Sequence, residues 1–120
     1  DDILADPRTE IFEGDVFTRI SQAAKPENPT YDAILLDVRS MAEFKDGHIV
    51  NAINIPLNGL GNNVKQIEKH RDKPIVTVCR SGSRSGSACA ILRKHGFENV
   101  KNLRGGMLAW ENSSLPVKRK

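Results

Sequence analysis

The stretch VCRSGSRSG, residues 78–86, places a cysteine at the end of an apolar run and two arginines shortly after it. Cys79 is followed at once by Arg80, and Arg84 comes four residues later, with serines and a glycine between them. A thiolate is a nucleophile, and neighbouring positive charge favours the thiolate over the thiol. Three interpretations fit this arrangement: a buried structural thiol, a phosphatase nucleophile, or a carrier of sulfur.

The loop after Cys79 has the composition of an anion-binding turn. A helical pattern begins at about Ser83 to Ser85, so unpaired N–H groups and the partial positive charge of a helix N-terminus should face the cysteine. Gly82 permits a tight turn or a close approach to a ligand, and serines such as Ser81 supply hydrogen-bond donors. Because these polar and charged residues do not belong in a core, we interpret Cys79 as reactive rather than inert.

The spacing from the cysteine to the second arginine separates the other two interpretations. Cysteine-dependent phosphatases use a C-x5-R loop, whose arginine and backbone N–H groups surround a tetrahedral phosphate. Here that position holds Ser85, and the arginine is Arg84, which gives C-x4-R. A shorter loop forms a smaller cradle, which suits a single sulfur atom on Cys79 better than a whole phosphate.

Short apolar runs alternate with helical patterns along the chain. The runs predict buried strands at 33–38, within 49–55, at 75–79 and at 98–103. The helical patterns lie at 15–25, 62–70, 84–96 and 105–112. This alternation predicts an α/β domain with a parallel sheet. Cys79 then lies at the carboxyl end of a strand, which is where open α/β sheets bind ligands.

The composition excludes several classes of protein. With 120 residues, 38% of them apolar and 28% charged, the chain suits one soluble globular domain over residues 1–120. No apolar run could span a bilayer, and no signal-peptide pattern is present. The net charge of +3 is mild, and the basic tail at 118–120 has no interleaved aromatic residues, so we expect no nucleic-acid partner. The chain begins with Asp1, as expected of a processed chain or of a piece of a longer protein.

The cysteines and histidines give no sign of a disulfide scaffold or of a metal site. Cys79 and Cys89 are too few for a scaffold and fit a reducing compartment, so we expect a cytoplasmic protein. Cys89 lies among apolar residues of a predicted helix, where we expect a small core residue too far from Cys79 to bridge it. The histidines have no metal-ligand spacing, either among themselves or with the cysteines, so no metal is predicted; they are His48, His70 and His95.

With these motifs in view, the sequence resembles the rhodanese family in its single-domain form. CRSGSR at 79–84 matches the family's active loop, C-x-x-G-x-R. LLDVRSMAEFKDGHIVNAINIPL at 35–57 resembles its D-V-R, E-F, G-H-I and A-x-N-I-P elements, and HGFENVKNLRGGMLAW at 95–110 resembles its G-F, V-x-x-L and G-G-x-x-A-W elements. The match covers about residues 34–110. One departure is Asn51 in place of the usual glycine, and asparagine tolerates left-handed backbone better than most residues.

The resemblance implies a rhodanese-like three-layer sandwich, a five-stranded parallel sheet flanked by helices. It also implies a sulfurtransferase with no cofactor beyond a covalent persulfide on Cys79. The thiolate would take a sulfane sulfur from a small anionic donor such as thiosulfate and pass it to cyanide, a thiol or a protein acceptor. Arg80 and Arg84 would bind the anionic donor and its leaving group, and Arg80, Ser81, Gly82, Ser83 and Arg84 would form the active loop.

Other residues are expected to support this loop. The resemblance makes Asp37, at the end of its strand, a partner of the loop, and it makes Arg39 a partner of Glu43. His48 should be a hydrogen-bonding residue that fixes the GHI turn. Trp110 should be a core residue.

Two further functions stay open. A regulatory docking module of the same fold, inside a larger protein, would bind a partner without turnover. The intact Cys79 with both arginines favours the enzyme over this alternative, because a binding module needs no activated thiol. A phosphatase or arsenate reductase would act on oxyanion substrates, and the loop length counts against it.

Overall fold

The structure is a computed structural model, and it describes residues 10–11, 34–103, 105–112 and 117–118. Within these residues, five strands form one sheet in the order β1-β5-β4-β2-β3, and every neighbouring pair is parallel. In chain order the strands are β1 (Glu10–Ile11), β2 (Ile34–Asp37), β3 (Ile53–Asn54), β4 (Ile75–Val78) and β5 (Val100–Leu103). The strand that precedes Cys79 is therefore the central one.

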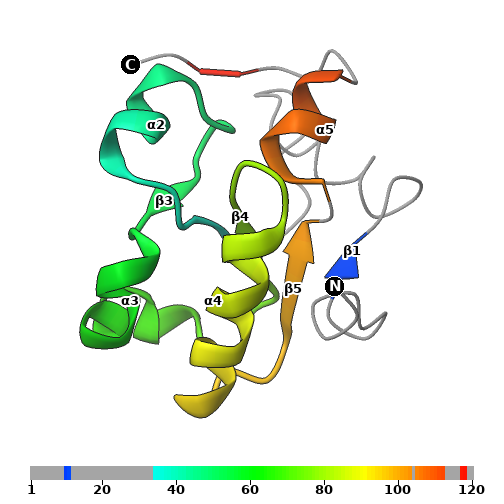
Figure 1. Cartoon of the computed structure of the whole chain (residues 1–120). Helices are drawn as coiled ribbons and strands as arrows, with labels where there is room; N and C mark the ends of the chain where they lie inside the picture. The colour runs from blue at the N-terminus through cyan, green and yellow to red at the C-terminus, as the bar shows by residue number, and fades with distance from the viewer. Residues whose placement is uncertain (1–9, 12–33, 104, 113–116, 119–120) are drawn as a thin grey trace.

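Helices pack against the sheet and also lie beyond the carboxyl end of β5 (Figure 1). The described helices are α2 (Met41–Asp46), α3 (Leu57–Asn63), the 3-10 helix η1 (Val64–His70), α4 (Ser83–Lys94) and α5 (Gly106–Asn112). Helices α3 and α4 pack side by side, whereas α2 and α5 lie beyond the carboxyl ends of the strands (Figure 1). None of the helices in the described part of the chain is long and apolar enough to cross a bilayer.

Successive side chains of β4 point to opposite faces of the sheet, and each face has its own part of the core. Ile75 packs in a cluster with Leu60 of α3 and Leu92 of α4. Val76 and Val78 point the other way, into a cluster with Trp110 of α5. Each residue of β4 is buried, which explains why this strand is a continuous apolar run. Sheet and helices form the layered α/β arrangement that the sequence predicts.

Most elements lie where the sequence predicts them. All four strand predictions are confirmed, as are the helical patterns that became α4 and α5. The helical pattern at 62–70 is also confirmed, as the end of α3 and a 3-10 helix from Val64, but the earlier start of α3 at Leu57 was not predicted. The i,i+3 spacing of Val64 and Ile67 is that of a 3-10 helix, which has three residues per turn.

Other expectations fall on particular residues. Asn51 has a φ of 70°, so it adopts the left-handed backbone that asparagine tolerates better than most residues. Trp110 and Cys89 are both buried, as core residues should be. The helix predicted at 15–25 lies outside the described residues. A single domain over residues 1–120 therefore stays a prediction.

Candidate active site

Cys79 lies immediately beyond the last residue of β4, buried at the carboxyl end of the central strand. The chain then turns so sharply that the backbone N–H of Gly82 donates to the Cys79 sulfur, with an N···Sγ distance of 3.0 Å. An N–H group aimed at sulfur stabilises negative charge on that atom. The turn therefore places a hydrogen-bond donor against the sulfur of a cysteine that is otherwise packed in the core.

Gly82 makes this turn. Its φ is 107°, a conformation that favours glycine, and α4 begins at the next residue, Ser83. The Gly82 carbonyl accepts from the N–H of Gly86 at 3.1 Å, which starts the helix. The predicted tight turn and the predicted helix start are both confirmed. As a result, the first turn of α4 lies directly beside the cysteine.

Strand β5 holds the loop from below through a side chain that the sequence analysis missed. Asn102 donates from Nδ2 to the Gly82 carbonyl at 2.9 Å and accepts a hydrogen bond from the Ser85 hydroxyl. The Thr77 hydroxyl donates to the Ser85 carbonyl at 2.9 Å. These groups are buried, so their hydrogen bonds are shielded from water. An asparagine near the end of a predicted strand, between Lys101 and Leu103, was the signal that could have identified this support.

Helix α5 holds the loop from the other side. The N–H of Met107 donates to the Cys79 carbonyl at 2.8 Å, and the N–H of Leu108 donates to the Arg80 carbonyl at 3.0 Å. This contact leaves no room for a side chain at Gly106. A Cβ there would lie 2.7 Å from the Arg80 carbonyl oxygen and closer still to that of Cys79. The contact between α5 and the active loop therefore requires a glycine at position 106.

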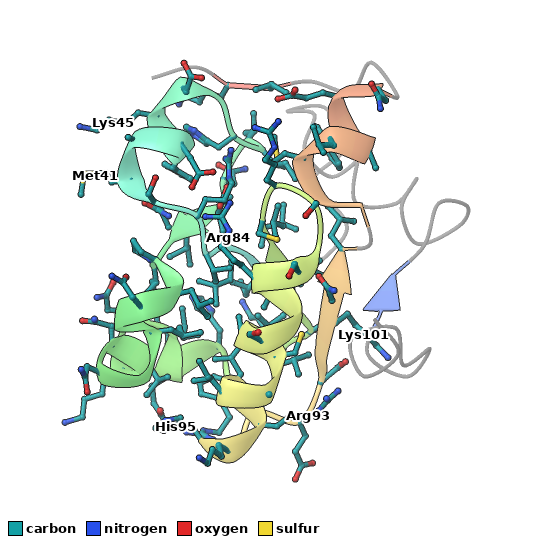
Figure 2. All side chains as sticks on the ribbon, in the orientation of Figure 1. Met41, Lys45, Arg84, Arg93, His95 and Lys101 are labelled. Atoms are coloured by element: carbon teal, nitrogen blue, oxygen red, sulfur yellow. The ribbon has the colours of Figure 1, made fainter. Side chains whose placement is uncertain are left out.

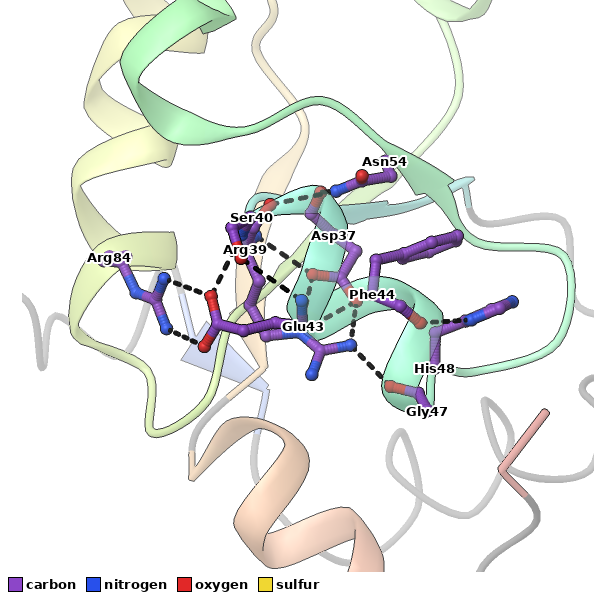
Figure 3. A network of polar contacts seen from close by, with 9 residues as sticks. All are labelled: Asp37, Arg39, Ser40, Glu43, Phe44, Gly47, His48, Asn54 and Arg84. Atoms are coloured by element: carbon purple, nitrogen blue, oxygen red, sulfur yellow. Dashed lines mark hydrogen bonds and ion pairs between the residues drawn. The ribbon is translucent and has the colours of Figure 1, made fainter. Parts of the chain in front are cut away.

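The acidic and basic residues around the loop pair differently from the expectation (Figure 3). Arg39 binds Asp37, with Nε at 2.9 Å from Oδ1 and Nη2 at 2.7 Å from Oδ2. Arg39 also donates to the Gly47 carbonyl at 2.7 Å. Both members of this pair are buried. The expected pairing of Arg39 with Glu43 is therefore wrong. Asp37 interacts with the loop through its charge, which helps to raise the pKa of Arg84.

Glu43 instead binds the loop arginine. Arg84 donates from Nη1 to Oε1 at 2.8 Å and from Nη2 to Oε2 at 2.9 Å. Figure 2 shows the Arg84 side chain lying toward α2, the helix that carries Glu43. The sequence analysis did not predict α2, so it had no basis for the direction of the Glu43 side chain. The capping box from Ser40 to Glu43 was the available signal.

This pair shifts the pKa values of both partners. The hydrogen bonds from Arg84 lower the pKa of Glu43 from 4.5 to about 2, against a smaller opposing effect of burial. The same hydrogen bonds raise the pKa of Arg84. Both groups therefore carry full charge at neutral pH.

Hollows lie on either side of the Glu43–Arg84 pair. One, of about 210 Å³, is lined by Glu43 and by Arg80 and Glu111, among others, between α2 and α5. The other, of about 340 Å³, is mainly apolar and is lined by Arg84 together with Leu57 and its neighbours. One member of the ion pair therefore lines each hollow, Glu43 the first and Arg84 the second.

His48 has the structural role expected of it. Its Nδ1 lies 2.7 Å from the Phe44 carbonyl oxygen, its ring stacks on the Phe44 ring, and its side chain is buried. Ser81 and Ser83 are exposed at the loop surface. Their part in binding a ligand stays a prediction, as do the roles of Cys79 and Arg80.

Comparison with known proteins identifies the family. The rhodanese-like domain matches residues 21–113, and the chain belongs to this family. It is 42% identical to a sulfurtransferase of Allochromatium vinosum over 88 residues, which is 73% of this chain and 80% of that protein. It is 38% identical to YibN of Escherichia coli over 73% of this chain and 62% of YibN.

Solved structures agree on the fold. The rhodanese-related protein of Thermoplasma volcanium superposes with a TM-score of 0.75 at 30% identity, over 93% of this chain and 99% of that one. The thiosulfate sulfurtransferase of Pseudomonas aeruginosa gives a TM-score of 0.74 at 25% identity, over 93% of this chain and 20% of that one. The resemblance seen in the sequence motifs is confirmed.

The close approach of α5 to the loop makes a prediction about Gly106. Gly106→Ala should lower the free energy of unfolding by about 1–3 kcal/mol, because the new Cβ meets backbone carbonyls and the φ of 55° disfavours a side chain. Urea denaturation measures this. Gly61→Ala is the matched control, since a Cβ at Gly61 meets nothing within 4 Å. Equal stabilities for the two variants would contradict the tight contact.

The lowered pKa of Glu43 predicts how the stability of the protein changes in acid. Folding favours the ionised carboxylate, so its contribution to stability is present above pH 4.5 and is lost as the pH falls toward about 2. Glu43→Gln should therefore destabilise the protein by at most about 1 kcal/mol near neutral pH, since both side chains are partly exposed. The difference in the free energy of unfolding between the wild type and Glu43→Gln, measured by urea denaturation, should become smaller as the pH falls. A difference that is constant or that grows in acid would contradict the assignment.

Proposed function

We propose that this protein is a sulfurtransferase that carries a sulfane sulfur as a persulfide on Cys79. The observation that carries the proposal is the loop geometry, in which the backbone nitrogen of Gly82 lies 3.0 Å from the Cys79 sulfur and donates a hydrogen bond to it. The name of the Allochromatium relative, a sulfurtransferase, supports the same reaction class.

In the first half-reaction, the Cys79 thiolate attacks the outer sulfur of a donor such as thiosulfate. A bond forms between Sγ and that sulfur, and the sulfur–sulfur bond of the donor breaks. Its electron pair leaves with sulfite. Covalent catalysis of this kind divides one difficult transfer into two easier steps.

In the second half-reaction, a thiophilic acceptor such as cyanide or a thiol attacks the outer sulfur of the persulfide. The bond to Sγ breaks, and its electron pair returns to Cys79 as the thiolate. A protein thiol could serve as this acceptor. No metal or organic cofactor is needed, since the charge moves only between sulfur atoms and anions.

The loop residues have distinct roles in this proposal. Backbone N–H groups from Gly82 and its neighbours Ser81 and Ser83 hold the negative charge on the cysteine or persulfide sulfur. Arg80 and Arg84 attract the anionic donor and the leaving sulfite. Asp37, Arg39 and Glu43 support the loop rather than take part in the chemistry; this interpretation rests on their hydrogen bonds.

The alternative is a docking module that uses this fold without turnover. The chain spans 62% of YibN, and the partners of any longer protein of this kind are a separate matter from the reaction at Cys79. Chemistry at the cysteine distinguishes the two functions directly.

The test is the intact mass of the protein before and after thiosulfate, and again after cyanide. The wild type should gain the mass of one sulfur atom, about 32 Da, and cyanide should remove it. Cys79→Ser should gain nothing, whereas Cys89→Ser, the matched control at a buried core position, should behave as the wild type.

A gain in mass on Cys79→Ser would assign the sulfur to another residue and overturn the proposal. A folded wild type that gains no sulfur from thiosulfate or from a thiosulfonate would favour the docking module.

A further inference from the structure

The two arginines of the active loop are electrostatically different. Arg84 is bound by both carboxylate oxygens of Glu43, at 2.8 and 2.9 Å. Arg80 is exposed and, among the described residues, has no ion-pair partner. Arg39, which lines the same hollow as Arg80, is bound to Asp37. Of these arginines, Arg80 alone forms no ion pair among the described residues, although Glu43 and Glu111 line the same hollow.

Glu43 is held in place to make this contact. It occupies the third position of α2, and the backbone N–H of Ser40 donates to its Oε1 at 3.0 Å. The backbone N–H of Glu43 in turn donates to the Ser40 hydroxyl at 3.2 Å, so this reciprocal pair of hydrogen bonds fixes the residue. The same oxygen, Oε1, binds Arg84 (Figure 3). The carboxylate is therefore a fixed negative charge beside the loop rather than a mobile surface group.

Thiosulfate and sulfite carry two negative charges in their fully ionised forms, and this site offers them less positive charge than the loop sequence suggests. We propose that Glu43 is a specificity-determining residue, which offsets the charge of Arg84 and so weakens the preference of the loop for dianions over singly charged sulfur compounds. This inference deepens the proposed function and rests on it for the identity of the ligand as a sulfur donor.

The size of the effect follows from Coulomb's law. A fixed change in the local potential alters the binding free energy in proportion to the ligand charge. The fold-change in affinity for a dianion should therefore be the square of that for a monoanion of the same shape. Because the side chains of Arg84 and Glu43 are 40% and 34% exposed, solvent screens the effect, and it should weaken further in salt.

A purely positioning role for Glu43 predicts the opposite result. If the carboxylate served to hold Arg84 where an anion needs it, its loss would free the arginine side chain and weaken anion binding. The two roles therefore differ in the sign of the change, and the charge dependence of that change adds a second test.

The experiment compares the wild type with Glu43→Gln by titrating the amide resonances of Gly82 and Ser83 with sulfate and with methanesulfonate. These anions have similar shapes and carry two charges and one. We expect Glu43→Gln to bind sulfate about ninefold and methanesulfonate about threefold more tightly than the wild type does, with both factors falling in salt. Ser40→Ala, which frees the carboxylate without removing it, should shift both affinities in the same direction by less.

Glu68→Gln is the matched control, because Glu68 forms an ion pair with Arg71 away from the loop. It removes the same charge from the protein and should leave both affinities unchanged. Weaker sulfate binding by Glu43→Gln, equal factors for the two anions, or no anion-dependent shift in either protein would overturn the inference.

Sulfur loading from thiosulfate and from methanethiosulfonate, followed by intact mass, separates this inference from the proposed function. Loading of Cys79 with an unchanged anion preference in Glu43→Gln would overturn the role of Glu43 alone. The expected change in anion affinity without any sulfur on Cys79 would overturn the proposed transfer and leave the electrostatic role of Glu43 supported.

Discussion

The site depends on one constraint, which is that the backbone after Cys79 must curve until the Gly82 N–H lies against the cysteine sulfur. The turn requires a left-handed residue at position 82, and it is held on both sides. Asn102 of β5 binds the Gly82 carbonyl, while the first N–H groups of α5 bind the carbonyls of Cys79 and Arg80. With its carbonyls bound elsewhere, the loop can direct N–H groups at the sulfur. Strand β5 and helix α5 thus together fix the peptide groups of the loop from Cys79 to Gly82.

Charge around this loop is arranged in pairs with different consequences. The Asp37–Arg39 pair is buried and ties the end of β2 to the Gly47 carbonyl, so its role is structural. The Glu43–Arg84 pair is partly exposed and contributes little to stability, yet it sets the charge that an incoming anion meets. The presence of an arginine in an active-site loop therefore does not predict the affinity for anions unless its ion-pair partner is also known.

Local patterns were sufficient for most of the fold. The continuous apolar runs at β2 and β4 and the loop that contains Gly82 placed Cys79 correctly at the carboxyl end of a parallel strand. That this strand is the central one was not predicted. Pairings between distant segments were beyond such reasoning, because the partner of Glu43 depends on the direction in which α2 presents it. Asn102 was missed for a similar reason, since its role appears only once β5 lies beside β4. Side-chain direction, rather than element type, was what the sequence left undetermined.

The central claim is that this loop holds a sulfur atom on Cys79 through its backbone N–H groups. A crystal structure of the protein after treatment with a thiosulfonate or thiosulfate would test it most directly. We predict a second sulfur bonded to Sγ and lying within about 3.5 Å of loop N–H groups that include Gly82. A bare Cys79 in treated crystals, or an outer sulfur turned away from the loop, would contradict the account.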